Sequence, residues 1–242
     1  MVSCNVMHTC PMTKSILNSA TPRADLLCTD NGRSAIERRL GEIDAPHVAP
    51  LNAWVRSIRD RGVLTPESAA TIPWFDPHSA GVNAKVLLLL QDPSGTASAT
   101  QFISPDNNDP TARYTTEACN EAGLARDARL HWNVFPWWVN VPGGSKTKAG
   151  SVPDPTRPPE TWPAARTKAA KLTGELIALL PQLRVIVVLG VQAQNGYKAV
   201  EKAGLELPQD VEVMHGLSLS PPGFHSHRAE VINVLRNAAR IA

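Results

Sequence analysis

The sequence predicts a single α/β domain, built as an open, mainly parallel four-stranded sheet with helices on both faces. Short apolar runs alternate along the chain with segments of helical period, which is the order expected of a parallel sheet with crossover helices. The clearest runs are continuously apolar, as in strands that are buried on both faces. The 242 residues are 43% hydrophobic and 19% charged, which supplies enough apolar material for a core and excludes global disorder.

Residues 1–33 have no sustained hydrophobic period, so we expect a loosely ordered N-terminal extension before a single domain of residues 34–242. The domain opens with two predicted helices, Ser34–Leu40 and Pro46–Arg61. The second has apolar residues at positions i, i+4 and i+7, which form one face of a helix.

Four strand candidates follow, each a short run rich in apolar residues. In chain order they are Lys85–Leu90, Arg129–Val134, Arg184–Leu189 and Val211–His215. A helix candidate follows each strand. These helices are Thr115–Gly123, Ala164–Leu180, Gln192–Ala203 and about His227–Ile241. A long Pro-, Gly- and Ser-rich loop separates the second strand from its helix.

Composition limits the partners that the chain can have. The formal charge of +2 and the pI of about 8.4 neither establish nor exclude a nucleic-acid partner. The longest apolar runs, such as Val86–Leu90, are far shorter than the roughly 20 residues that cross a bilayer, so we expect no membrane attachment. The four cysteines (Cys4, Cys10, Cys28 and Cys119) lack a CxxC spacing, which disfavours a zinc site. We therefore expect reduced thiols, no metal or other cofactor, and a cytoplasmic location of bacterial type.

Polar residues stand where three of the predicted strands end. Gln91 and Asp92 follow the first strand, Asn133 ends the second, and His215 ends the fourth. Polar residues commonly cap strands, and any one of these alone would more often be structural than catalytic. Ligands of parallel sheets bind outside the carboxyl ends of the strands, so three such groups favour a shared site.

These segments resemble the uracil-DNA glycosylase superfamily over about residues 80–242. Gln91-Asp92-Pro93 is similar to that family's water-activating motif, Asn133 is placed like its base-reading Asn, and His215-Gly-Leu-Ser-Leu-Ser220 is similar to its His-containing loop. The third strand, with Gly190 after it, also matches the family. The resemblance implies a divergent, monomeric branch that removes uracil from DNA by base flipping in base excision repair, near the nucleoid.

The resemblance assigns the chemistry to three side chains. Asp92 would orient the attacking water and offset the positive charge that develops on the sugar, and His215, while neutral, would donate a hydrogen bond to the leaving uracil. Asn133 carries both a donor and an acceptor, which suits the O4 and N3–H edge of uracil and mismatches cytosine.

Other positions would complete the site. Gln91 and Ser94 would bind substrate, and either Phe102 or Tyr114 would stack on the flipped base. Leu219 is expected to fill the gap in the duplex, or else to anchor its loop. Contacts to the DNA backbone are expected from Ser218, Ser220 and Arg228. Further positive potential would come from Lys146, Lys148, Arg157, His225 and His227, although a solvated loop is the more ordinary interpretation of the two lysines.

The pattern also departs from the family. Ser94 stands where the family has a Tyr that excludes thymine, and Gly216 and Leu217 replace Pro and Ser after the histidine. The exact base preference therefore stays open. The cysteine spacing does not match the family's iron–sulfur branches.

The residues bear on four other functions. A serine hydrolase would use Ser94, but GxSxG is absent. A P-loop at residues 143–147 lacks the Gly before its Lys, and Gly190 opens no GxGxxG dinucleotide motif. The strongest alternative to an enzyme is a protein of glycosylase fold that binds uracil-containing or abasic DNA without turnover.

Overall fold

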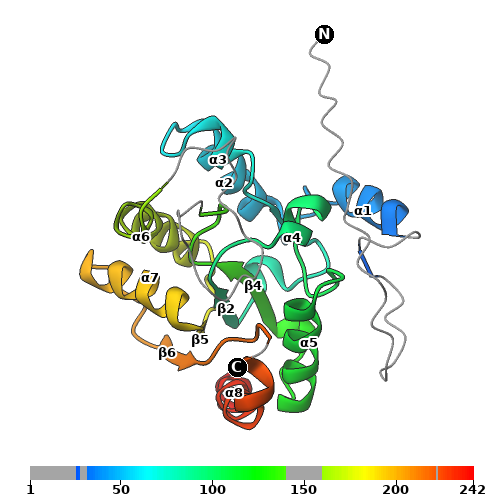
Figure 1. The fold of residues 1–242 in the computed structure, drawn as a ribbon, viewed down its shortest axis with the longest axis vertical. Helices are drawn as coiled ribbons and strands as arrows, with labels where there is room; N and C mark the ends of the chain where they lie inside the picture. Colours follow the sequence, from blue (N-terminus) through cyan, green and yellow to red (C-terminus); the bar gives the residue numbers. More distant parts are fainter. Residues whose placement is uncertain (1–25, 28–31, 140–159, 222) are drawn as a thin grey trace.

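The chain folds into three layers, with a parallel four-stranded sheet between two layers of helices (Figure 1). The computed structural model describes residues 26–27, 32–139, 160–221 and 223–242. The strands of the sheet are β2 (Val86–Leu90), β4 (Arg129–Asn133), β5 (Val185–Leu189) and β6 (Glu212–Gly216). Their order across the sheet is β4-β2-β5-β6, and every pair is parallel. The predicted parallel sheet is confirmed.

Strand β2 lies inside the sheet and is buried on both faces. Its first four side chains have no exposed surface. Leu87 and Leu89 pack against one layer, while Val86 and Leu88 pack against the other. The continuous apolar sequence of β2 therefore reflects its position inside the sheet, where helices cover both faces.

Two groups of helices cover the sheet. The first face carries α2 (Ala49–Asp60), α6 (Trp162–Ala178) and α7 (Val191–Lys202). The second face carries α5 (Pro110–Ala122) and α8 (Gly223–Ile241). Each corresponds to a predicted helix, and no described helix has the length and apolarity needed to cross a membrane.

Two helix starts differ from the prediction. Helix α5 begins five residues before Thr115, because the Asp109 side chain accepts a hydrogen bond from the backbone N–H of Ala112 at 2.9 Å and Pro110 occupies the first helical position. Helix α8 begins at Gly223 and has non-helical backbone at His227, where we expected the helix to start.

The sequence patterns missed a set of short elements between α2 and α5. Strands β1 (Trp74–Phe75) and β3 (Phe102–Ile103) form a separate two-stranded parallel sheet. Helices α3 (Pro66–Ala69) and α4 (Gly95–Thr100), with the 3₁₀ turns η1 (Gly81–Asn83) and η2 (Arg126–Ala128), complete the region. Two-residue strands are too short to show a period of two.

Helix α1 (Gly32–Gly41) matches the first predicted helix and packs near the β1–β3 sheet. Leu27, in the expected extension, is fully buried and forms a parallel bridge with Asn107. Leu27, Ala35 and Phe102 pack as one small cluster. The described part of the extension is thus docked on the domain.

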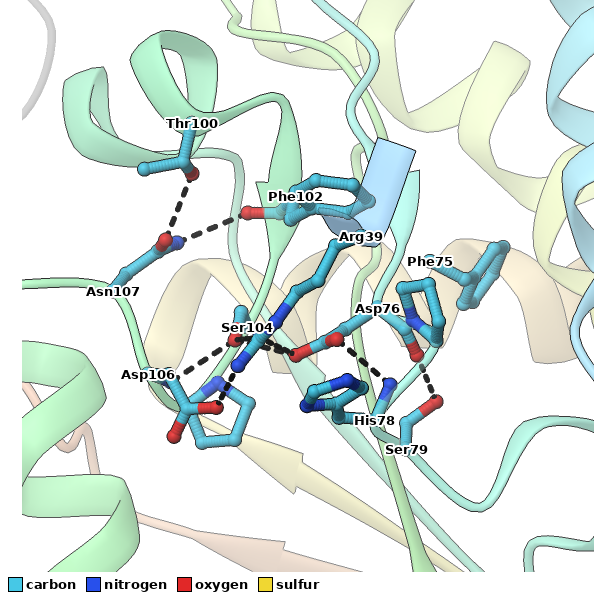
Figure 2. Close-up of polar contacts among 12 residues, drawn as sticks. Arg39, Phe75, Asp76, His78, Ser79, Thr100, Phe102, Ser104, Asp106 and Asn107 are labelled. Carbon is cyan, nitrogen blue, oxygen red and sulfur yellow. Dashed lines mark hydrogen bonds and ion pairs between the residues drawn. The ribbon is translucent and has the colours of Figure 1, made fainter. Parts of the chain in front are cut away.

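A buried network of charges connects α1 to this region. The Arg39 guanidinium, 1% exposed, donates to Asp76 Oδ2 and to Asp106 Oδ2, each at 2.7 Å (Figure 2). Ser104 donates to the same Asp76 oxygen at 2.5 Å. Arg126 donates to both oxygens of Asp106, at 2.9 and 2.7 Å. We call these five residues the arginine–carboxylate network.

The network holds Asp106 in its charged form. Burial alone would raise the pKa of Asp106, but hydrogen bonds and charges from Arg126 and Arg39 outweigh it and lower the pKa to about 2. Because this pKa lies below the ordinary value of 3.8, the stabilisation is fully present above about pH 4 and is lost as pH falls through about 2.

Asp76→Ala should strongly destabilise the fold, because it leaves Arg39 buried without one of its two carboxylate partners. We expect a loss of about 3–5 kcal/mol in the free energy of unfolding. Denaturant titration of both variants measures the effect, with Asp44→Ala as control. Asp44 pairs with Arg56 at the same 2.7 Å but both are exposed, so about 0–1 kcal/mol is expected there. Equal losses in the two variants would contradict a structural role for the network.

Candidate functional site

The carboxyl ends of β2 and β4 lie side by side, and this juxtaposition forms the centre of the candidate site. Leu90 is the register partner of Asn133. The pairing continues past the strands, since Val134 N donates to Leu90 O at 2.8 Å and Phe135 N donates to Gln91 O at 3.0 Å. Gln91 and Asp92 therefore leave the sheet directly beside Asn133, as predicted.

Packing behind this edge is tight. Helix α7 approaches so closely that a Cβ on Gly196 would lie 2.5 Å from Val134 Cγ1 and 3.0 Å from Phe135 Cζ. Glycine at this position allows the helix to press the segment after β4 into place. The backbone beside Asn133 is thus fixed from two directions, by β2 and by α7.

The side chain of Asn133 is the most informative group at this edge. The residue is only 5% exposed, and its carboxamide makes no hydrogen bond with the described residues, but the polar atoms of the carboxamide remain accessible to solvent. An accessible carboxamide without a protein partner can exchange hydrogen bonds with water for hydrogen bonds with a ligand.

The carboxylate of Asp92 lies next to a potential orienting group. Gln91 Nε2 donates to Asp92 Oδ1 at 2.9 Å, and both residues are half-buried. The contact fixes one carboxylate oxygen. The pair therefore presents an oriented carboxylate near the edge of the sheet.

Ser94 has a structural role that the sequence analysis did not predict. Its hydroxyl accepts a hydrogen bond from the N–H of Ala97 at 3.1 Å and so caps α4. It also donates to Asp109 Oδ2 at 3.3 Å, at the start of α5. Ser94 connects the segment after β2 to α5.

The loop after β6 folds back toward the carboxyl ends of the strands. Gly190, at φ +95°, donates its N–H to Gly216 O at 2.9 Å, and a Cβ at Gly190 would lie 3.3 Å from Ser218 Cβ. At the other side, the hydroxyls of Ser220 and Thr111 are 3.2 Å apart. Ser218 and Ser220 therefore lie between the start of α7 and the start of α5.

His215 does not join Asn133. It lies on the edge strand β6 with its side chain exposed, and its ring centroid is 6.5 Å from that of Tyr197 on α7. Asn133 lies on the opposite edge strand, and three interstrand spacings separate the strands by about 14 Å. Leu130 and Trp132 face the α6–α7 layer, so alternation directs Asn133 to the other face. The expectation that Asp92, Asn133 and His215 meet is therefore wrong for His215 in this conformation.

Neither predicted stacking residue is available to a base. Phe102 has no exposed surface and packs against Leu27 and Ala35. Tyr114 is 7% exposed, its ring stacks on Phe224 with centroids 4.8 Å apart, and its hydroxyl lies 2.8 Å from His225 Nε2. Phe102 was a candidate because it is near Asp92 in sequence and Tyr114 because it opens the next helix, but both belong to the core.

Leu219 and Arg228 also differ from expectation. Leu219 is 1% exposed within the core between the sheet and α5 and α8, so it anchors its loop rather than projecting toward DNA. Arg228 pairs with Glu121 of α5, which raises the pKa of Arg228 and offsets its charge. His225 and His227 are exposed near the start of α8.

Some predicted features lie outside the described residues. These are Lys146, Lys148, Arg157, the segment 143–147, Cys4, Cys10 and Cys28. Cys119 is buried, and burial raises the pKa of its thiol to about 11, so it is not a nucleophile at neutral pH. Among the described residues no group of three His, Cys, Asp or Glu side chains could hold a metal ion.

Sequence reasoning missed Val191. It follows Gly190 at the end of β5 and is 66% exposed, more than any other large hydrophobic residue described. Its place immediately after a strand end was a usable signal.

The chain matches no protein-family model, and a search of the curated proteins finds no match.

Asn133→Leu should leave the stability of the protein nearly unchanged, because the carboxamide has no partner to lose. We expect a change within about 1 kcal/mol. Asn107→Leu is the matched control, since the equally buried Asn107 accepts from Thr100 Oγ1 at 2.8 Å and donates to Phe102 O at 3.0 Å (Figure 2). Denaturant titration should show a loss of about 1–3 kcal/mol for each partner left unpaired in the control. An Asn133→Leu loss as large as that of the control would make Asn133 structural.

Proposed function

We propose that the chain is a monofunctional DNA glycosylase that hydrolyses the N-glycosidic bond of uracil in DNA. The observation that carries the proposal is the juxtaposition of Asn133, whose carboxamide has no partner among the described residues, with the end of β2, from which Gln91 and Asp92 follow. The order of the motifs and their resemblance to the uracil-DNA glycosylase superfamily support the same assignment, and the α/β fold is compatible with it.

Asn133 would read the base. Its amide can donate to O4 of uracil and accept from N3–H, which satisfies both ends of the carboxamide. Cytosine presents a donor at position 4 and an acceptor at position 3, so both contacts would become repulsive. A buried amide is selective because a wrong partner leaves it unpaired.

Asp92 would act on the sugar and on water. The bond between C1′ and N1 breaks, its electron pair leaves with the uracil, and the oxygen of one water bonds to C1′. The carboxylate stabilises the positive charge that develops on the sugar and takes a proton from that water. The hydrogen bond from Gln91 keeps one carboxylate oxygen oriented.

His215 has support from the resemblance rather than from its position. To donate to the leaving base it must approach Asn133 from the far edge of the sheet. It lies two residues before the segment Leu217–Ser220, which folds back to α5 and α7. The DNA-bound state would therefore have to reposition the end of β6.

The position of His215 favours a second candidate. A protein that binds uracil-containing or abasic DNA without turnover needs the base-reading amide but not the histidine. The burial of Phe102, Tyr114 and Leu219 also favours the binding protein. A glycosylase that flips its base uses an aromatic side chain to stack on the base and an apolar side chain to fill the gap in the duplex. Only the glycosylase would produce an abasic site, so this product distinguishes the two candidates.

Incubation with a labelled uracil oligonucleotide and a chelator should produce alkali-labile sites. Asp92→Asn should lower the single-turnover rate by about 10²–10⁴-fold with little loss of DNA affinity, because the carboxylate acts on the transition state. Asp210→Asn, an exposed carboxylate elsewhere, is the control and should react as wild type.

Tight binding with no cleavage at enzyme excess would favour the binding protein. Neither binding nor cleavage would exclude both candidates. The assay should include single- and double-stranded DNA, thymine mismatches and hypoxanthine.

Asn133→Asp should change which base is accepted. A protonated aspartic acid presents a hydroxyl donor and a carbonyl acceptor, and its donor–acceptor arrangement can suit cytosine. We expect slower excision of uracil and measurable excision of cytosine in the same assay. Unchanged selectivity would remove Asn133 from the base site.

A further inference from the structure

Val191 is the most exposed large hydrophobic residue in the described part of the chain, with 66% of its surface accessible to solvent. It opens α7, directly after Gly190 at the end of β5. Single apolar residues are common on protein surfaces, so exposure alone assigns no role to this side chain. The position of Val191 in the fold is what distinguishes it.

Neither packing nor helix formation accounts for a valine at this position. The core behind α7 is formed by other residues of the helix, which are Ala193, Gly196, Tyr197 and Val200. Valine is also a weaker helix former than alanine or an unbranched polar residue, because its branched Cβ loses rotational freedom in a helix. A polar residue at position 191 would therefore serve the fold at least as well.

The end of β5 lies at the edge of the sheet that carries the candidate site. Val188 of β5 and Trp132 of β4 both pair with Leu89 of β2, so the three strands end at the same level. Strand β5 is two interstrand spacings, about 10 Å, from β4. Val191 and Asn133 therefore stand at one edge of the sheet, on opposite sides of β2.

The segment after β6 holds the turn before Val191 without covering its side chain. Gly190 donates its N–H to Gly216 O at 2.9 Å, and a Cβ on Gly190 would lie 3.3 Å from Ser218 Cβ. Gly190 has φ +95°, a backbone conformation that favours glycine. These contacts support Val191 from behind and place it close to Ser218, a residue expected to contact the DNA backbone.

Among the described residues, no other large hydrophobic side chain at this edge is exposed rather than buried or half-buried. Leu219, which was expected to fill the gap in the duplex, is 1% exposed, and Leu217 packs against the same part of the core. The other exposed large hydrophobic residue, Ile241, lies at the opposite edge of the sheet. Its neighbour Ala242 accepts a hydrogen bond from Lys85 Nζ, just before β2 begins.

We propose that Val191 fills the gap left in the DNA duplex when uracil is flipped out. The inference rests on the proposed binding of uracil-containing DNA, and it assigns to Val191 the role expected of Leu219. Apolar side chains that insert between base steps offset the unstacking that base flipping requires. The strand spacing keeps Val191 apart from Asn133, as the gap must be apart from the flipped base. Only a duplex contains such a gap, so the role concerns double-stranded DNA alone.

The rate of uracil excision from duplex and from single-stranded DNA tests this role. Val191→Ala removes two methyl groups that would insert, so single-turnover excision from duplex DNA should slow about tenfold. Excision from single-stranded DNA should keep the wild-type rate, and Val191→Leu should keep it on both substrates. Ile241→Ala is the matched control, because it removes apolar surface at the opposite edge, and it should react as wild type. Equal slowing on the two substrates, or slowing on neither, would overturn the role of Val191.

Binding of duplex DNA with a stable abasic analogue gives a readout that needs no turnover. Such a duplex contains the gap but no base to excise, so Val191→Ala should weaken its binding about tenfold and leave the binding of the single strand unchanged. The measurement applies equally to a glycosylase and to a protein that only binds DNA. Equal affinities of wild type and Val191→Ala would overturn the role of Val191 and leave the proposed function intact. Neither excision nor DNA binding by the wild-type protein would overturn both.

Discussion

The burial of β2 on both faces is the constraint on which the rest of the structure depends. A strand without exposed side chains must have strands on both sides and helices above and below, and here these are β4, β5 and the two helical layers. The chain can place polar groups only where β2 ends, at Gln91 and Asp92. Pairing in register then fixes which residue lies beside them, and that residue is Asn133. The candidate site follows from the way the core is built.

Two buried asparagines show how burial and bonding together distinguish structure from function. Asn107 and Asn133 are similarly inaccessible to solvent, but Asn107 has two partners and Asn133 has none among the described residues. The same contrast separates Arg39, whose guanidinium is paired with two carboxylates, from Arg129, whose Nε is unpaired. Satisfied polar groups specify the fold. Unsatisfied ones are candidates for contacts with ligands or ordered water.

The sequence was sufficient to predict the elements that have a long hydrophobic pattern. All four strands and the longer helices were predicted close to their observed positions, because burial on two faces or on one helical stripe leaves a readable period. The β1–β3 sheet was not predictable, since it has two residues per strand and is held by Arg39 and Asp76, which come from distant segments. Its existence depends on tertiary charge pairing that no local pattern reveals.

The predicted site residues show the same difference between local sequence pattern and tertiary packing. Asp92 and Asn133 were predictable because adjacent parallel strands align their carboxyl ends. Phe102, Tyr114 and Leu219 were chosen by chain position and residue type, and neither property determines whether a side chain faces a crevice or the core. Tyr114 packs on Phe224 across the interface of α5 and α8, a contact between residues 110 positions apart. Exposure of such residues is decided by the packing of whole helices.

The distance between His215 and Asn133 can be explained by the place of β6 in the sheet. Strand β6 is an edge strand with one neighbour, and most of its residues are partly or fully exposed. Moving the exposed His215 side chain would give up its ring contact with Tyr197, and local opening is least costly where few apolar groups are packed. Gly216 and Gly190 are joined by one backbone hydrogen bond at the end of the strand. The edge of the sheet that carries the histidine is therefore the part of the site that can rearrange, whereas Asp92 and Asn133 are held by the central strand.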